Sequence, residues 1–144
     1  MKIGFKRGDQ WYHTLTRMVT RSGYSHAALE IEGRLYESTA RKGGQPTAGV
    51  RDYPLTDDVA AQYVWLDLGT AHDAEAKARY EIVRGRGYDY LSWLAYMNIQ
   101  ARDKNRLLCY ELVMWLLGGD ADQRCTVEVI LLLVLNKFRK APHD

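Results

Sequence analysis

Two side chains far apart in the sequence have the chemistry of a nucleophile and its base, the thiol of Cys109 and the imidazole of His26. The apolar stretch 107–117 predicts a core helix that ends at Gly118-Gly119, which puts Cys109 in its first turn. The positive end of a helix stabilises a thiolate, and its N–H groups can receive the oxyanion of a tetrahedral intermediate. The alternative is an inert thiol, because cysteine is among the residues most often buried.

A predicted β-hairpin brings a carboxylate to His26. Residues 25–31 and 34–39 read as antiparallel strands joined by a two-residue turn, Glu32-Gly33. Across such a turn His26 and Glu37 are diagonal neighbours on one face, about 7–8 Å apart, so their side chains can meet. The carboxylate then fixes the tautomer of the imidazole and supports an imidazolium. A shift of one residue moves Glu37 to the other face, where it is an ordinary solvated carboxylate, and a lone histidine is commonly structural.

Four short motifs surround these residues in a fixed order. They read Tyr24-Ser25-His26-Ala27-Ala28-Leu29-Glu30-Ile31, Tyr36-Glu37-Ser38, Gly87-Tyr88-Asp89-Tyr90 and Leu108-Cys109-Tyr110-Glu111-Leu112-Val113. Together they resemble the landmarks of the permuted NlpC/P60 (YiiX-like) family of papain-like cysteine amidases and peptidases, in which the histidine precedes the cysteine. The resemblance covers about residues 4–137, almost the whole chain.

The resemblance implies an α+β, papain-like fold, in which a small antiparallel sheet or open barrel packs against helices and the nucleophile begins a central helix. Cys109 is then the nucleophile, His26 the general base and Glu37 the orienting residue. The implied substrate-binding residues are aromatic: Tyr24, Tyr88 and Tyr110.

The implied reaction is acyl transfer through a thioester. The thiolate attacks an amide carbonyl, the imidazole protonates the leaving group, and water or another acceptor releases the acyl group. This chemistry needs no metal or cofactor. The implied substrate is a peptide-like amide, of which the peptidoglycan stem peptide is the best-known example in the family.

Two other functions stay open. The related LRAT-like branch, acyltransferases or thioesterases acting on lipid acyl groups, shares the order of histidine and cysteine but tends to have another histidine where this sequence has Glu37. A catalytically inactive papain-like module, either a binding protein or a phage structural protein, is favoured by Tyr110, which replaces the serine common after the cysteine. Glu111 matches a glutamate of the family, and we expect it to act on the helix end or in a buried pair.

The elements that must position these residues follow an α+β order of helix, strands and helices. The first half predicts a helix over 10–20 and further strands over 50–53 and 63–68, the last with Val64, Leu66 and Leu68 on one face. The second half predicts helices over 73–84 and 107–117, a buried aromatic segment over 88–98, and a last helix capped by Thr126. The breaker-rich loop 41–49 is a candidate lid.

The last helix is apolar around most of its circumference, so we expect it in the core, with a dimer seam or a membrane-lying helix as the alternative. Basic residues at helix ends make either a small anion-binding patch or ordinary solvated termini: Arg84, Arg86, Lys137, Arg139 and Lys140.

Length and composition bound the remaining possibilities. The 144 residues, 47% of them hydrophobic and 26% charged, predict a single globular domain over 1–144. A net charge of +2 does not call for nucleic acid as a partner, and the longest apolar run is too short to span a membrane. The histidines lack the spacing of a metal site. Without an export signal we expect a cytoplasmic protein with Cys109 and Cys125 reduced; a phage origin and the oligomeric state stay open.

Overall fold

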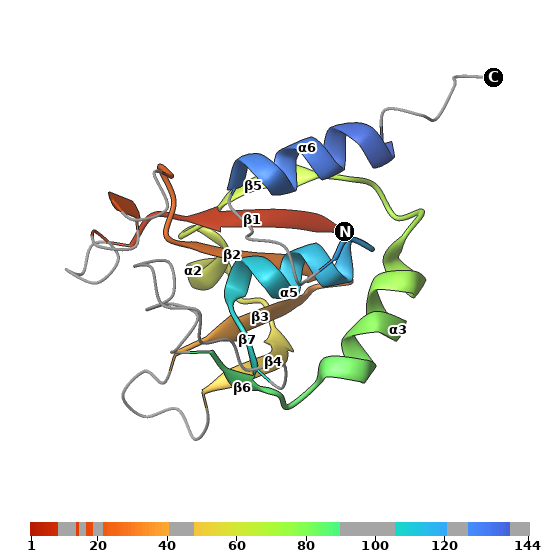
Figure 1. Ribbon diagram of the computed structural model, residues 1–144, viewed down its shortest axis with the longest axis horizontal. Coiled ribbons are helices and arrows are strands. Elements are labelled where there is room, and N and C mark those ends of the chain that lie inside the picture. The colour runs from red at the N-terminus through yellow and green to blue at the C-terminus, as the bar shows by residue number, and fades with distance from the viewer. Residues whose placement is uncertain are drawn as a thin grey trace.

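The computed structural model describes residues 1–8, 14, 17–18, 22–40, 48–89, 106–120 and 127–138. Within these ranges the predicted α+β class is confirmed: an open antiparallel sheet packs against helices (Figure 1). None of the helices in these ranges has the length and apolarity needed to cross a lipid bilayer.

Five of the described strands form one antiparallel sheet in the order β4-β3-β2-β1-β5, and this sheet does not close into a barrel. Their bounds are β1 Lys2–Lys6, β2 His26–Ile31, β3 Arg34–Thr39, β4 Gly49–Pro54 and β5 Val64–Asp67. Two short strands, β6 Gly87–Tyr88 and β7 Arg106–Leu107, pair in parallel beside β4. Tyr88 therefore lies in a short strand, although we expected the second half of the chain to be largely helical.

The hairpin of β2 and β3 has the predicted register. Its paired residues are Leu29 with Tyr36, Glu30 with Leu35, and Ile31 with Arg34. The turn residues Glu32 and Gly33 have φ angles of 51° and 74°, the positive values that a two-residue turn between twisted strands requires.

The first strand, β1, is not predicted from the sequence, because charged residues flank its apolar residues. Ile3 and Phe5 are buried, whereas Lys2 and Lys6 stand on the other side of β1. Only this alternation marks the segment as a strand, and it is too short to be distinctive. In the sheet β1 is nevertheless central, because it pairs with β2 on one side and with β5 on the other.

The described helices are α2 Asp57–Ala60, α3 Asp73–Val83, α5 Cys109–Leu116 and α6 Val127–Phe138. The helices expected over 73–84 and after Thr126 are confirmed, and the helix expected over 107–117 begins at Cys109, because Leu107 belongs to β7. Most of the predicted helix 10–20 lies outside the described residues, as do the aromatic segment beyond residue 89, the loop 41–47 and the positions of Thr126 and Cys125.

The core lies between the sheet and α5, which crosses β2 and β3 with α3 and α6 against it (Figure 1). Leu29 and Ile31 from β2 meet Leu112 and Val113 from α5, all fully buried. This packing holds the first turn of α5 close to the start of β2, where His26 lies.

Candidate active site

Cys109 is the first residue of α5 and is 5% exposed. The residue before it, Leu108, is the N-cap, and its side chain makes no capping hydrogen bond. Its own N–H donates to Oε2 of Glu111 at 2.9 Å, the helix-end role expected for that carboxylate. The Cys109 sulfur therefore lies at the positive end of a helix whose cap side chain offers no oxygen to the first-turn N–H groups.

His26 is the first residue of β2, and 13% of its side chain is exposed. Its Nε2 lies 2.8 Å from Oε2 of Glu37, the contact that the hairpin register predicts. An ionised carboxylate is only an acceptor, so Nε2–H donates to Glu37. Nδ1 is the ring nitrogen that remains for a second partner.

Cys109 lies close enough to His26 to act on the imidazole. Burial lowers the pKa of His26, but the interaction with a negatively charged Cys109, followed by the hydrogen bond and charge of Glu37, raises it to about 9. Cys109 and Glu37 therefore both favour the imidazolium form of His26. The structure brings together all three residues that the sequence proposes for catalysis.

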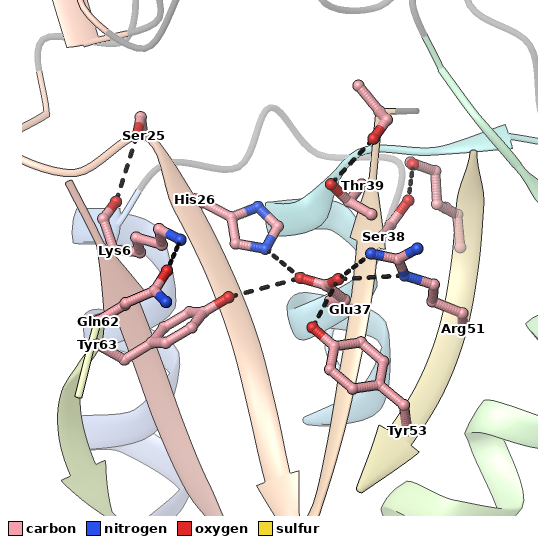
Figure 2. A network of polar contacts seen from close by, with 12 residues as sticks. Lys6, Ser25, His26, Glu37, Ser38, Thr39, Arg51, Tyr53, Gln62 and Tyr63 are labelled. Carbon is pink, nitrogen blue, oxygen red and sulfur yellow. Dashed lines mark hydrogen bonds and ion pairs between the residues drawn. The ribbon is translucent and has the colours of Figure 1, made fainter. Parts of the chain in front are cut away.

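Glu37 is held by residues from three parts of the sheet, and Figure 2 shows them converging on its carboxylate. Oε1 accepts from Nε and Nη2 of Arg51, at 3.2 and 2.7 Å, and from the Tyr53 hydroxyl at 3.0 Å. Oε2 accepts from His26 and, at 3.5 Å, from the Tyr63 hydroxyl. Only 6% of the Glu37 side chain is exposed, so a buried charge is compensated by these donors.

The partners decide the ionisation of the cluster. Burial raises the pKa of the Glu37 carboxyl, but the hydrogen bond and charge of His26, and then those of Arg51, lower it to about 2. Burial and then the charge of Glu37 raise the pKa of the Tyr53 and Tyr63 hydroxyls well above the ordinary value. Both tyrosines therefore stay neutral hydrogen-bond donors.

Arg51, Tyr53 and Tyr63 are absent from the residues that the sequence proposes for the site. Arg51 faces Glu37 directly across β3 and β4, and Tyr53 follows on the same face. The alternation of Arg51 and Tyr53 within a predicted strand is the signal that was open to sequence reasoning. Using this signal requires the register of β4 against β3. A two-residue turn fixes the register of a hairpin, but the longer connection over residues 40–48 does not.

The three proposed substrate tyrosines lie in different surroundings. Tyr110 is 2% exposed, and its hydroxyl donates to the carbonyl of Tyr24 at 2.8 Å, which leaves little of its ring for a substrate. The Tyr24 ring is partly buried against Phe5, with centroids 5.6 Å apart. Tyr88 is half-buried in β6.

Two hydrogen bonds tie the helix of the thiol to the hairpin of its partners. Tyr110, next to Cys109, bonds to the carbonyl of Tyr24, two residues before His26. Ser38, next to Glu37, donates its hydroxyl to the carbonyl of Leu107 at 2.5 Å, two residues before Cys109. We call these two contacts the braces, because each joins a neighbour of one site residue to the chain that leads into another.

In the described part of the chain, no three or more His, Cys, Asp or Glu side chains gather so that they could hold a metal ion. Comparison with protein-family models, with curated proteins and with solved structures finds no match to this chain.

Proposed function

We propose that this protein is a cysteine hydrolase that cleaves a peptide-like amide bond through a thioester intermediate. The observation that carries the proposal is the position of His26, which hydrogen-bonds to Glu37 and lies close enough to Cys109 to interact with it, with Cys109 at the first position of a helix. Nucleophile, base and orienting group in mutual contact are the arrangement that activates a thiol for acyl transfer.

In the first half of the reaction, the Cys109 thiolate attacks the amide carbonyl while His26 holds the proton. The N–H of Cys109 at the helix terminus donates to the developing oxyanion. His26 then gives its proton to the leaving nitrogen, the C–N bond breaks, and the acyl group stays on the sulfur.

In the second half, a water molecule attacks the thioester. His26, now neutral, takes a proton from the water, and the restored thiolate leaves with the carboxylic acid as product. Glu37 keeps Nε2 protonated throughout, so Nδ1 is the nitrogen that exchanges protons.

The proposal includes a papain-like relationship to the permuted NlpC/P60 enzymes. The order of His26, Glu37 and Cys109 in the chain, and a helix that packs on an antiparallel sheet, support that relationship. It favours amides of peptides, the peptidoglycan stem peptide among them, as the substrate class.

Thiol reactivity tests the proposal without a known substrate. We expect iodoacetamide to alkylate Cys109 at about pH 6 on the order of ten times faster than it alkylates free cysteine, because an imidazolium partner keeps a thiol ionised where an ordinary one is protonated. His26→Gln removes the partner and the advantage. Peptide mapping by mass spectrometry separates Cys109 from Cys125, the other cysteine of the sequence.

Activity tests the second step. Incubation with a panel of peptide amides should give an acyl-enzyme whose added mass maps to Cys109, and Cys109→Ala should lower turnover by a factor on the order of 10³ or more. A Cys109 that reacts no faster than free cysteine, in a protein that is folded by circular dichroism, would contradict the proposal and favour a binding module.

A further inference from the structure

The two oxygens of Glu37 have different partners. Two nitrogens of the Arg51 guanidinium, Nε and Nη2, contact the same oxygen, Oε1, and the Tyr53 hydroxyl contacts it as well. The other oxygen, Oε2, faces His26 at 2.8 Å. Figure 2 shows Arg51 and His26 on opposite sides of the carboxylate.

This division differs from the usual pairing of arginine with a carboxylate. In a common bidentate pair, two parallel N–H groups engage both oxygens, and the carboxylate then has fewer directions left for another donor. Here Nε and Nη2 of Arg51 both contact Oε1, so Oε2 is left for the imidazole. Because Arg51 stands directly opposite Glu37 across β3 and β4, the sheet itself sets this geometry.

We propose that Arg51 is a positioning residue of the site, which holds Oε1 of Glu37 so that Oε2 stays directed at Nε2 of His26. This role rests on the proposed function, because it matters for chemistry only if His26 serves Cys109. It acts through Glu37, without contact with the thiol or the substrate.

The charges of the cluster support this role. In the ion-pair form that the proposed function requires, the charges alternate in sign from the sulfur outward: thiolate, imidazolium, carboxylate and guanidinium, of Cys109, His26, Glu37 and Arg51 in turn. These four charges sum to zero. Without Arg51, the remaining three groups carry one buried negative charge that no cation compensates. Such a charge is costly, and a carboxyl group avoids the cost by taking up a proton.

The other groups that face His26 and Glu37 do not replace Arg51. Tyr53 and Tyr63 donate to Glu37 as neutral hydroxyls. Lys6 pairs with His26 in the register of β1 and β2, but its ammonium donates to Gln62 and lies over the Tyr63 ring, 5.7 Å from the centroid. Among the described residues, Arg51 is thus the cation other than the imidazolium that forms an ion pair with Glu37.

Removing Arg51 should therefore have a defined effect on the His26–Glu37 hydrogen bond. Arg51 lowers the pKa of the Glu37 carboxyl, so its loss raises that pKa. Glu37 then becomes neutral at a higher pH, and His26 loses its charged acceptor there. The bond should survive to low pH in the unmodified protein and disappear at a higher pH in the variant.

Proton NMR of protein labelled with ¹⁵N-histidine measures this bond directly, since a ring N–H held by a carboxylate gives a far-downfield, exchange-protected resonance. His26→Gln assigns the signal. We expect it in the unmodified protein from about pH 7 down to below about pH 4, because the Glu37 carboxyl stays ionised below its ordinary pKa. In Arg51→Met the pH at which it disappears should rise by at least about one pH unit, and Arg51→Lys should restore most of the range because it restores the charge.

Two further variants separate positioning from stability. Arg34→Met removes an ion pair between the same two strands, with Asp52 at 2.6 Å, and should leave the resonance unchanged. In a Glu37→Gln background, where the charged acceptor is already gone, adding Arg51→Met should change neither the His26 titration nor the signal. Circular dichroism at each pH confirms that every variant is folded.

The outcomes distinguish this inference from the proposed function. An unchanged resonance in Arg51→Met, or an equal effect of Arg51→Met with and without Glu37, would overturn the role of Arg51 even if Cys109 is alkylated rapidly. Slow alkylation of Cys109 in the unmodified protein would count against the hydrolase and leave the Arg51–Glu37–His26 result as it stands. If Arg51→Met does not fold, Arg51→Gln, which also removes the charge but keeps a polar side chain between the strands, makes the same test with the same expected shift.

Discussion

His26 and Glu37 each determine the charge of the other. Burial alone would lower the pKa of His26 and raise that of Glu37, yet both pKa values move the opposite way because of their partners. A raised histidine pKa contributes stability below its unfolded value of about 6.5, and this contribution is lost as the pH rises through about 9. A lowered carboxyl pKa contributes stability above about 4.5, which is lost as the pH falls towards 2. The charged pair therefore favours folding most strongly between about pH 4.5 and about pH 6.5.

Glu37→Gln tests this dependence at the level of the residue. Glutamine can still accept a hydrogen bond but has no charge, so the pKa of His26 should fall by at least about one unit while Cys109 continues to raise it. Titration of the ring by NMR measures the change, and the alkaline loss of the amide cleavage that we propose should begin at a correspondingly lower pH. Asp52→Asn is the matched control, because Asp52 bonds to Arg34 and Tyr80, away from the imidazole. An unchanged His26 titration in Glu37→Gln would show that the carboxylate does not govern the ring.

At the level of the elements, the β2–β3 hairpin is the part that the sequence predicts best. A two-residue turn leaves one register, and that register brings His26 to Glu37 without knowledge of any other strand. The first turn of α5 is predictable for a similar reason, because an apolar helix that ends at paired glycines has a limited range of starting points.

The rest of the site depends on pairings that local patterns do not specify. Arg51 and Tyr53 reach Glu37 through the register of β4 on β3, and Tyr63 reaches it from the chain before β5, whose partner β1 is some sixty residues away in the sequence. The aliphatic alternation in β5 is real, but Val64 is 59% exposed and Leu66 38% exposed, because β5 is an edge strand and its face extends beyond the core. Alternation alone does not say which face is covered.

The braces join α5 to the β2–β3 hairpin, so removing either one tests whether the contact between these elements matters for the site. Tyr110→Phe removes a partly buried hydrogen bond and Ser38→Ala a buried one, so each should lower the free energy of unfolding by about 1–2 kcal/mol. Each should also slow the alkylation of Cys109, since the thiol is then held less firmly against His26. Tyr80→Phe is the control: it removes a hydrogen bond of 2.7 Å to Asp52 and should cost similar stability with no change in alkylation. Equal alkylation rates in all three variants would exclude a role of the braces in the site.

Across the whole molecule, α6 divides its apolar residues between the core and the surface. The sequence predicts core burial for this helix, with a dimer seam or a membrane-lying helix as the alternative. The structure buries one face, with Val127, Ile130 and Val134 inside, and leaves Leu132 and Leu135 more than half exposed. The near-uniform apolar sequence conceals this division, because the periodicity that marks a surface helix is weak here.

A matched pair of alanine substitutions on α6 tests whether the division holds in solution. Ile130→Ala empties a site with 0% exposure and should lower the free energy of unfolding by about 2–4 kcal/mol, whereas Leu132→Ala, at 59% exposure, should change it by no more than about 0.5 kcal/mol. Alanine is the better helix former in both cases, so the difference between the variants reports burial and not helix propensity. Urea unfolding followed by circular dichroism measures both. A large cost at Leu132 would mean that this face is covered in solution, and a sedimentation measurement on the same variant would then show whether a second copy of the chain covers it.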